Sequence, residues 1–128
     1  MRTFSKFIVS LFLLMGCSFV QAGDELVSPK TAYSLIADKK AVIIDVREDD
    51  EWNEGHIADA VHIPLNQLDA HLSELQQYKD TAVITQCRSG GRSLKALEVL
   101  KSAGFSKVSS MDGGIVAWSK DGLATQQK

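Results

Sequence analysis

The chain has 128 residues, a net charge of −2 and the composition of an ordinary globular protein. This length fits one domain and excludes a second. The mildly acidic balance argues against nucleic-acid binding, which calls for a basic surface.

Residues 1–22 differ from the rest of the chain and predict a secretory signal peptide. They carry the basic residues Arg2 and Lys6, then a short apolar stretch, and they end in a small-residue cleavage site at Ala22. The apolar stretch is too short to span a bilayer as a helix of the mature protein. We therefore expect an exported protein whose single domain covers residues 23–128, with 12 basic and 16 acidic residues and a net charge of −4.

A lipoprotein signal is the alternative interpretation of this segment. Residues 14–18, Leu-Met-Gly-Cys-Ser, resemble a lipobox, in which Cys17 would carry a lipid anchor and become the mature N-terminus. Cleavage after Ala22 is favoured because its small-residue site is good and Met15 is unusual in a lipobox. Under either interpretation Cys17 is not a free thiol of the folded domain, and Cys87 is the one that remains.

The first half of the mature chain predicts one helix and three strands. In order these are an edge strand at 25–27, a helix from Ser28-Pro29 to about residue 39, a central strand at 41–46 and a short strand at 60–64. Ser28-Pro29 is an N-cap followed by a helix-starting proline, and residues 41–46 are almost continuously apolar, as in parallel strands covered on both faces. The charged stretch from 47 to 53 is given no element.

The second half predicts three more helices and two more strands. In order these are an amphipathic helix at 66–77, a strand at 81–86, a helix from Ser93 to Ala103, a strand at 106–111, a helix at 115–119 and a frayed tail from 125. Gly104 is expected just after the end of the helix that begins at Ser93. The alternation of strands and helices predicts an α/β domain with a parallel sheet.

Residues 87–93, Cys-Arg-Ser-Gly-Gly-Arg-Ser, form a tight turn between a strand and a helix. Backbone N–H groups converge at such a helix N-terminus and hold negative charge, and Gly90 and Gly91 are expected to allow φ values that other residues avoid. A lone cysteine is either a small apolar core residue or a reactive thiol. The position of Cys87 favours a nucleophile with a lowered pKa.

The remaining residues of the turn have separate expected roles. Arg88 directly follows the cysteine and is expected to bind an anionic substrate. Arg92 either does the same or pairs with an acidic residue below the loop. Ser89 and Ser93 are expected to donate hydrogen bonds within the loop, and Ser93 alternatively only caps the helix.

Taken together, the motifs of this chain resemble those of a single-domain rhodanese. They are Val42-Ile43-Ile44-Asp45-Val46-Arg47, Glu51-Trp52, Gly55-His56-Ile57, Ala60, Ile63-Pro64-Leu65, residues 87–93, and Gly113-Gly114 followed by Trp118. The resemblance implies a three-layer α/β fold with a central, mostly parallel five-stranded sheet flanked by helices. With its signal peptide, the chain is similar to the exported thiosulfate sulfurtransferases of Gram-negative bacteria, which implies a periplasmic protein.

The resemblance also implies an activity and a set of site residues. Cys87 would take a sulfane sulfur from thiosulfate as a persulfide and pass it to cyanide or a thiol. The substrate-binding residues would be Arg88, Ser89, Gly90, Gly91, Arg92 and Ser93. Asp45 and Arg47 would belong to a structural charge network that holds neighbouring loops.

Cofactors, metals and a membrane span are not expected. His62 and His71 have no ligand spacing with each other or with Cys87, so no metal site is predicted. His56 is expected to be a hydrogen-bonded structural histidine, and Trp52 and Trp118 to be core or loop-anchoring aromatic residues. The expected partners are a small-molecule sulfur donor and acceptor.

Two alternatives to a thiosulfate sulfurtransferase follow from the same residues. One is a persulfide carrier for a thiol-containing periplasmic protein. The other is a cysteine phosphatase, but those enzymes resemble one another in placing five residues between the cysteine and the arginine. Here Cys87 and Arg92 have four residues between them and position 93 is serine, so the ring suits a sulfur atom better than a phosphate.

Overall fold

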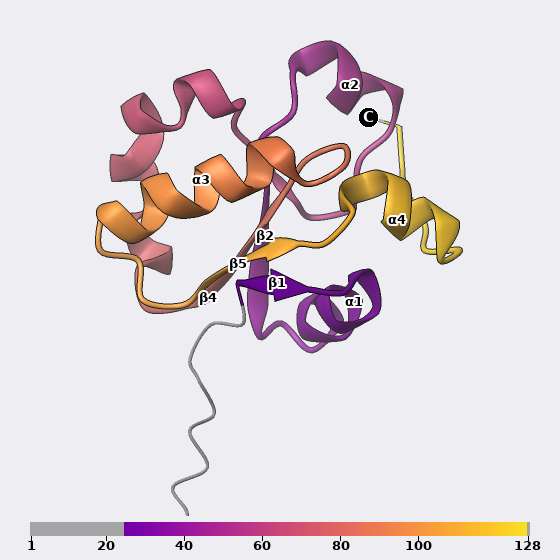
Figure 1. Ribbon diagram of the computed structural model, residues 1–128, viewed down its shortest axis with the longest axis horizontal. Coiled ribbons are helices and arrows are strands. Elements are labelled where there is room, and N and C mark those ends of the chain that lie inside the picture. The colour runs from indigo at the N-terminus through magenta and orange to yellow at the C-terminus, as the bar shows by residue number, and fades with distance from the viewer. Residues whose placement is uncertain (1–24, 128) are drawn as a thin grey trace, which may run out of the picture.

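A computed structural model describes residues 25–127 (Figure 1). The predicted signal peptide, the boundary after Ala22 and the alternative lipid anchor at Cys17 lie outside the described residues. The elements in order are β1 (Leu26–Val27), α1 (Pro29–Ala37), β2 (Ala41–Asp45), α2 (Asp49–Glu54), β3 (Val61–His62), the 3₁₀ helices η1 (Leu65–Gln67) and η2 (Asp69–Tyr78), β4 (Ala82–Gln86), α3 (Gly91–Ser102), β5 (Val108–Met111) and α4 (Gly114–Lys120). None of the helices in this range is long and apolar enough to cross a membrane.

The five strands form one sheet in the order β1-β5-β4-β2-β3, and every neighbouring pair is parallel. The predicted five-stranded α/β sheet is therefore confirmed, with β1 at one edge as expected. β2 and β4 are paired along their whole length, from Ala41 opposite Ala82 to Asp45 opposite Gln86. Because the strands end side by side, Cys87 and Arg47 emerge from the same carboxyl edge of the sheet, where sites of parallel α/β proteins lie.

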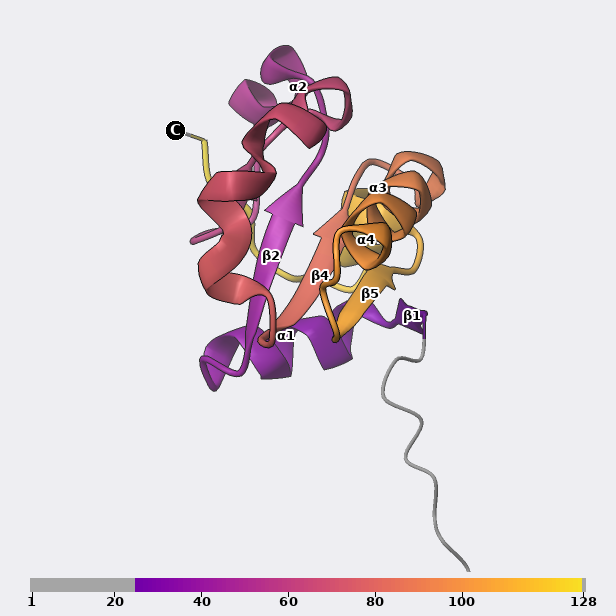
Figure 2. The same cartoon turned by 90° about the vertical axis from the view of Figure 1, so that its left-hand side faces the viewer.

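Helices cover both faces of the sheet, which makes three layers (Figures 1 and 2). On one face Ile44 and Val83 pack with Leu97 and Leu100 of α3 and with the leucines of η2. On the other face Ile43 and Ile84 pack with Ala32 of α1 and Trp118 of α4. Successive residues of β2 thus point into two different cores, which is why its sequence is an almost continuous apolar run.

The helix expected at residues 66–77 is present but is wound as two 3₁₀ segments. The leucines at 65, 68, 72 and 75 still face the core, with Leu68 and Leu75 fully buried. Their spacing of three, four and three residues lies between the 3.0-residue period of a 3₁₀ helix and the 3.6-residue period of an α-helix. The pattern therefore predicts which face is buried, but not which winding is adopted.

The charged stretch after β2 forms α2, a helix that was not predicted. It has no buried residue, so it leaves no apolar pattern to detect. Its first turn carries Asp49, Asp50 and Glu51, which suit the positive end of a helix dipole. The Glu51 carboxylate also accepts a hydrogen bond from the Glu48 N–H (3.1 Å), as in a capping box.

The prediction of a frayed tail from residue 125 is wrong for residues 125–127. His56 and Gln126 exchange two backbone hydrogen bonds of 2.8 Å in an antiparallel bridge. The Trp118 indole N–H donates to the Ala124 carbonyl (3.0 Å), and Leu123 packs against the core. The polar composition of the tail hides these backbone contacts, which tie it to the loop after α2.

Candidate active site

Cys87 lies directly after β4, and α3 begins at Gly91, two residues earlier than expected. Gly90 has a φ of +122°, a conformation that favours glycine, and this lets the chain turn at once into the helix. Gly91 is the first helical residue and has no positive φ, so the expectation that it also needs glycine is wrong. A side chain at Gly91 would meet open space.

The Cys87 sulfur faces hydrogen-bond donors of the loop. The Gly90 N–H donates to Sγ at 3.1 Å, and the Ser93 hydroxyl lies 3.5 Å from Sγ. Burial raises the pKa of the thiol, but hydrogen bonds from the Ser93 hydroxyl and from the N–H groups of Ser93, Gly90 and Ser89 outweigh it. The pKa of Cys87 is therefore lowered from its ordinary value, which enlarges the thiolate fraction.

Arg92 is held by an acidic residue, the second of the two arrangements considered for it. Its guanidinium forms a bidentate pair with the Glu51 carboxylate, at 2.6 and 2.9 Å. The hydrogen bond from Arg92 lowers the pKa of Glu51 to about 2 despite the opposing effect of burial. The pair is therefore fully formed above the ordinary carboxyl pKa and is lost only as the pH falls towards 2.

Arg88 and Ser89 are exposed at the mouth of the loop. Within residues 25–127 the Arg88 guanidinium takes part in none of the ion pairs. Arg88 is thus the loop cation that is free to meet a ligand, whereas Arg92 is already neutralised.

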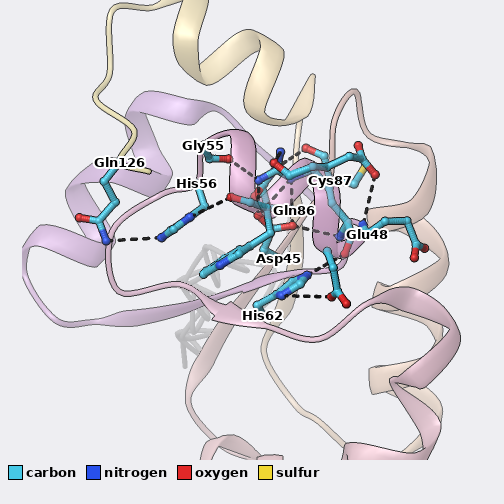
Figure 3. Close-up of polar contacts among 12 residues, drawn as sticks. Asp45, Glu48, Gly55, His56, His62, Gln86, Cys87 and Gln126 are labelled. Atoms are coloured by element: carbon cyan, nitrogen blue, oxygen red, sulfur yellow. Dashed lines mark hydrogen bonds and ion pairs between the residues drawn. The ribbon is translucent and has the colours of Figure 1, made fainter. Parts of the chain in front are cut away.

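Asp45 and Arg47 form a buried network next to the loop (Figure 3). Arg47 Nη2 lies 2.8 Å from Asp45 Oδ2, and Nε lies 3.1 Å from both carboxylate oxygens. The same guanidinium donates to the carbonyls of Glu51 (3.2 Å), in the first turn of α2, and of Gly55 (2.8 Å), its C-cap residue. The network therefore fixes α2, which in turn presents the Glu51 side chain to Arg92.

The histidines make structural contacts. The His56 and His62 rings each stack against the Trp52 indole, with centroid distances of 3.7 and 4.6 Å. His56 Nδ1 bonds the Trp52 carbonyl and His62 Nε2 bonds the Arg47 carbonyl. His71 is remote and contacts Glu74. Among the described residues no three His, Cys, Asp or Glu side chains are arranged to hold a metal ion.

The N-terminus of α4 also contacts the loop, a feature that the sequence did not reveal. The Ile115 N–H donates to the Cys87 carbonyl (2.9 Å), and the Val116 N–H donates to the Arg88 carbonyl (3.1 Å). Gly114 has a φ of +59°, and a Cβ there would lie closer to the Cys87 and Arg88 backbone than van der Waals contact allows. The close approach of α4 therefore requires glycine at 114.

Gly114→Ala is expected to displace the loop, and Gly122→Ala is its matched control. Both glycines have a positive φ, so each alanine carries the same backbone strain of about 1–2 kcal/mol. Gly122 faces open space, whereas the clash at 114 should add about 1–3 kcal/mol. Denaturant unfolding measures the stability difference, and the alkylation rate of Cys87 reports the loop. Equal effects of the two variants would contradict the role given to Gly114.

The family model for the rhodanese-like domain matches residues 28–121. An uncharacterised protein of Synechocystis is 36% identical over 99 residues, which cover 77% of this chain and 54% of that protein. A sulfurtransferase of Allochromatium vinosum is 33% identical over 100 residues, which cover 78% of this chain and 92% of the relative. The chain thus spans about half of the first relative and most of the second.

A solved structure has the same fold over most of the chain. The rhodanese-related protein from Thermoplasma volcanium is 28% identical, with a TM-score of 0.74, over 81% of this chain and 99% of that one. Relatives from Bacillus subtilis and Arabidopsis thaliana also carry sulfurtransferase names. On the strength of the family match and the shared fold, this chain belongs to the rhodanese-like domain family.

Proposed function

We propose that the protein is a sulfurtransferase that moves a sulfane sulfur from thiosulfate, or a related donor, through a Cys87 persulfide to cyanide or a thiol. The observation that carries the proposal is the sulfur of Cys87 held by the Gly90 N–H and the Ser93 hydroxyl, with a lowered pKa. The sulfurtransferase names of the relatives support the same class of reaction.

The reaction consists of two displacements. The Cys87 thiolate attacks the outer sulfur of thiosulfate, a new S–S bond forms, and the S–S bond of thiosulfate breaks with its electron pair leaving on sulfite. An acceptor nucleophile then attacks the outer sulfur of the persulfide, and Cys87 leaves as the thiolate. The loop N–H groups that stabilise the thiolate suit the terminal persulfide sulfur, which is also an anion.

Arg88 is the residue that binds the donor in this proposal. It is exposed beside Cys87 and its guanidinium suits the sulfonate oxygens of thiosulfate. Ser89, Gly90, Gly91 and Ser93 contribute the loop backbone and hydroxyl groups around the sulfur. Arg92 contributes through its pair with Glu51, which holds the loop against α2.

The protein would act in the periplasm after export by its signal peptide, with an outer-membrane lipoprotein anchored at Cys17 as the alternative. In this compartment a thiol-containing protein is a second kind of acceptor. A persulfide carrier for such a partner would form the same adduct but release it slowly to cyanide and quickly to the partner's thiol.

The test is the intact mass of the protein after incubation with thiosulfate. One added sulfur atom is expected on Cys87, and cyanide should remove it with formation of thiocyanate. Protein alkylated at Cys87 beforehand is the control and should gain nothing. Hydrolysis of an aryl phosphate without a sulfur adduct would instead support a phosphatase. The pairing of Arg92 with Glu51 disfavours a phosphatase, because the charge of that arginine is already neutralised.

A further inference from the structure

Three buried hydroxyl groups lie behind the Cys87 sulfur. They belong to Thr85 on β4, Ser93 on α3 and Ser110 on β5, and all three residues are fully buried. Ser93 Oγ lies 3.5 Å from Cys87 Sγ and 2.7 Å from Ser110 Oγ. It also donates to the Gly90 carbonyl at 2.9 Å. Ser93 is therefore the link between the sulfur and Ser110.

The number of protons decides the direction of the bond between Ser93 and Ser110. A serine hydroxyl has one proton and can donate one hydrogen bond. Ser93 uses its proton either for the Gly90 carbonyl or, when Cys87 is ionised, for the sulfur. In neither state is a proton left for Ser110. The 2.7 Å bond must therefore be donated by Ser110 and accepted by Ser93.

The Ser110 side chain is available for this role. Among the described residues its hydroxyl has Ser93 as its hydrogen-bond partner, whereas Thr85 donates to the Ser93 carbonyl (2.7 Å). A buried hydroxyl without a partner is unfavourable, so the bond to Ser93 is kept in both states of the sulfur. A hydroxyl that accepts a hydrogen bond is itself a stronger donor, because such chains polarise one another.

We propose that Ser110 is a positioning residue that acts on Cys87 through Ser93. By donating to Ser93 it orients the Ser93 hydroxyl, whose proton turns from the Gly90 carbonyl to the sulfur when the thiol ionises. The inference rests on the proposed role of Cys87 as the nucleophile. It adds Ser110, a residue of β5 that lies 23 positions after Cys87 in the chain, to the groups that stabilise the thiolate and the persulfide anion.

The charged groups around the sulfur remain the same when Ser110 is changed. They are Arg88 in the loop, Arg92 on α3 and its partner Glu51 on α2. Cys87 also belongs to a buried apolar cluster that includes Val46, Ile63 and Leu68. A change in the ionisation of Cys87 in a Ser110 variant therefore reports the hydroxyl chain.

The test is the rate of alkylation of Cys87 by iodoacetamide as a function of pH. Ser110→Ala should shift the midpoint of this profile upwards by about one pH unit. This is the size expected when Ser93, which bonds the Cys87 thiolate, loses the hydrogen bond that it accepts from Ser110. Ser109→Ala, its neighbour on β5 with a side chain outside this chain of hydroxyls, should leave the midpoint unchanged. Ser110→Thr, which keeps the hydroxyl, should leave the midpoint close to that of the unchanged protein.

A double variant keeps the test sharp if Ser110→Ala also loosens the fold. In the Ser93→Ala background, Ser110→Ala should shift the midpoint no further, since Ser110 acts through Ser93. An unchanged midpoint in Ser110→Ala, or a second full shift in the Ser93→Ala background, would overturn the proposal. Alkylation reads the ionisation of the thiol and not sulfur transfer, so failure of the proposed function is detected separately, by the thiosulfate mass shift.

Discussion

The Cys87→Ser variant is expected to lose all transfer of sulfur from thiosulfate to cyanide while keeping its fold. A serine oxygen cannot form a persulfide, and its hydroxyl does not ionise near neutral pH, so neither displacement can take place. The smaller side chain fits the buried site, and the Gly90 N–H and Ser93 hydroxyl can still bond its oxygen. The free energy of unfolding should change by about 1 kcal/mol or less.

Two measurements separate loss of chemistry from loss of structure. Thiocyanate formation measures the activity, and denaturant unfolding measures the fold. His71→Ala is the control, since His71 lies away from the loop and contacts Glu74; it should retain full activity. Residual turnover in Cys87→Ser above the uncatalysed rate would place the chemistry at another residue and contradict the proposed function.

The parts of the fold that follow from local pattern could be predicted from the sequence. The apolar runs that became β2 and β4 are unmistakable because each strand is buried on both faces. The turn after β4 is marked by glycines and by a cysteine between a strand and a helix. Because Cys87 directly follows a predicted parallel strand, its position at the carboxyl edge of the sheet could be inferred from the sequence alone.

The contacts that complete the site could not be predicted, because they join residues far apart in the chain. Glu51 and Arg92 are 41 positions apart, and Glu51 lies on a helix with no buried face. Ser110 is one of several serines near β5, and only the pairing of β4 with β5 places it behind Ser93. Gly114 has no side chain that would indicate a role. It matters because a side chain there would clash with the backbone of Cys87 and Arg88.

Loss of the Arg47 side chain is expected to destabilise the fold more than loss of any surface charge. In Arg47→Met the Asp45 carboxylate stays fully buried without its cation, and the carbonyls of Glu51 and Gly55 lose a donor. Breaking a buried pair in this way lowers the free energy of unfolding by about 3–5 kcal/mol. Lys101→Met is the matched control, because it breaks the exposed 2.9 Å pair with Glu25, worth about 0–1 kcal/mol.

Removing both charges should recover part of the lost stability. In Arg47→Met combined with Asp45→Asn no uncompensated charge remains buried, so the free energy of unfolding should exceed that of Arg47→Met alone. The activity should not recover with it, because α2 still lacks the anchor that presents Glu51 to Arg92. Urea unfolding and thiocyanate assays on the same preparations measure the two effects. If Arg47→Met were no more destabilising than Lys101→Met, the network would not be what holds α2 beneath the loop.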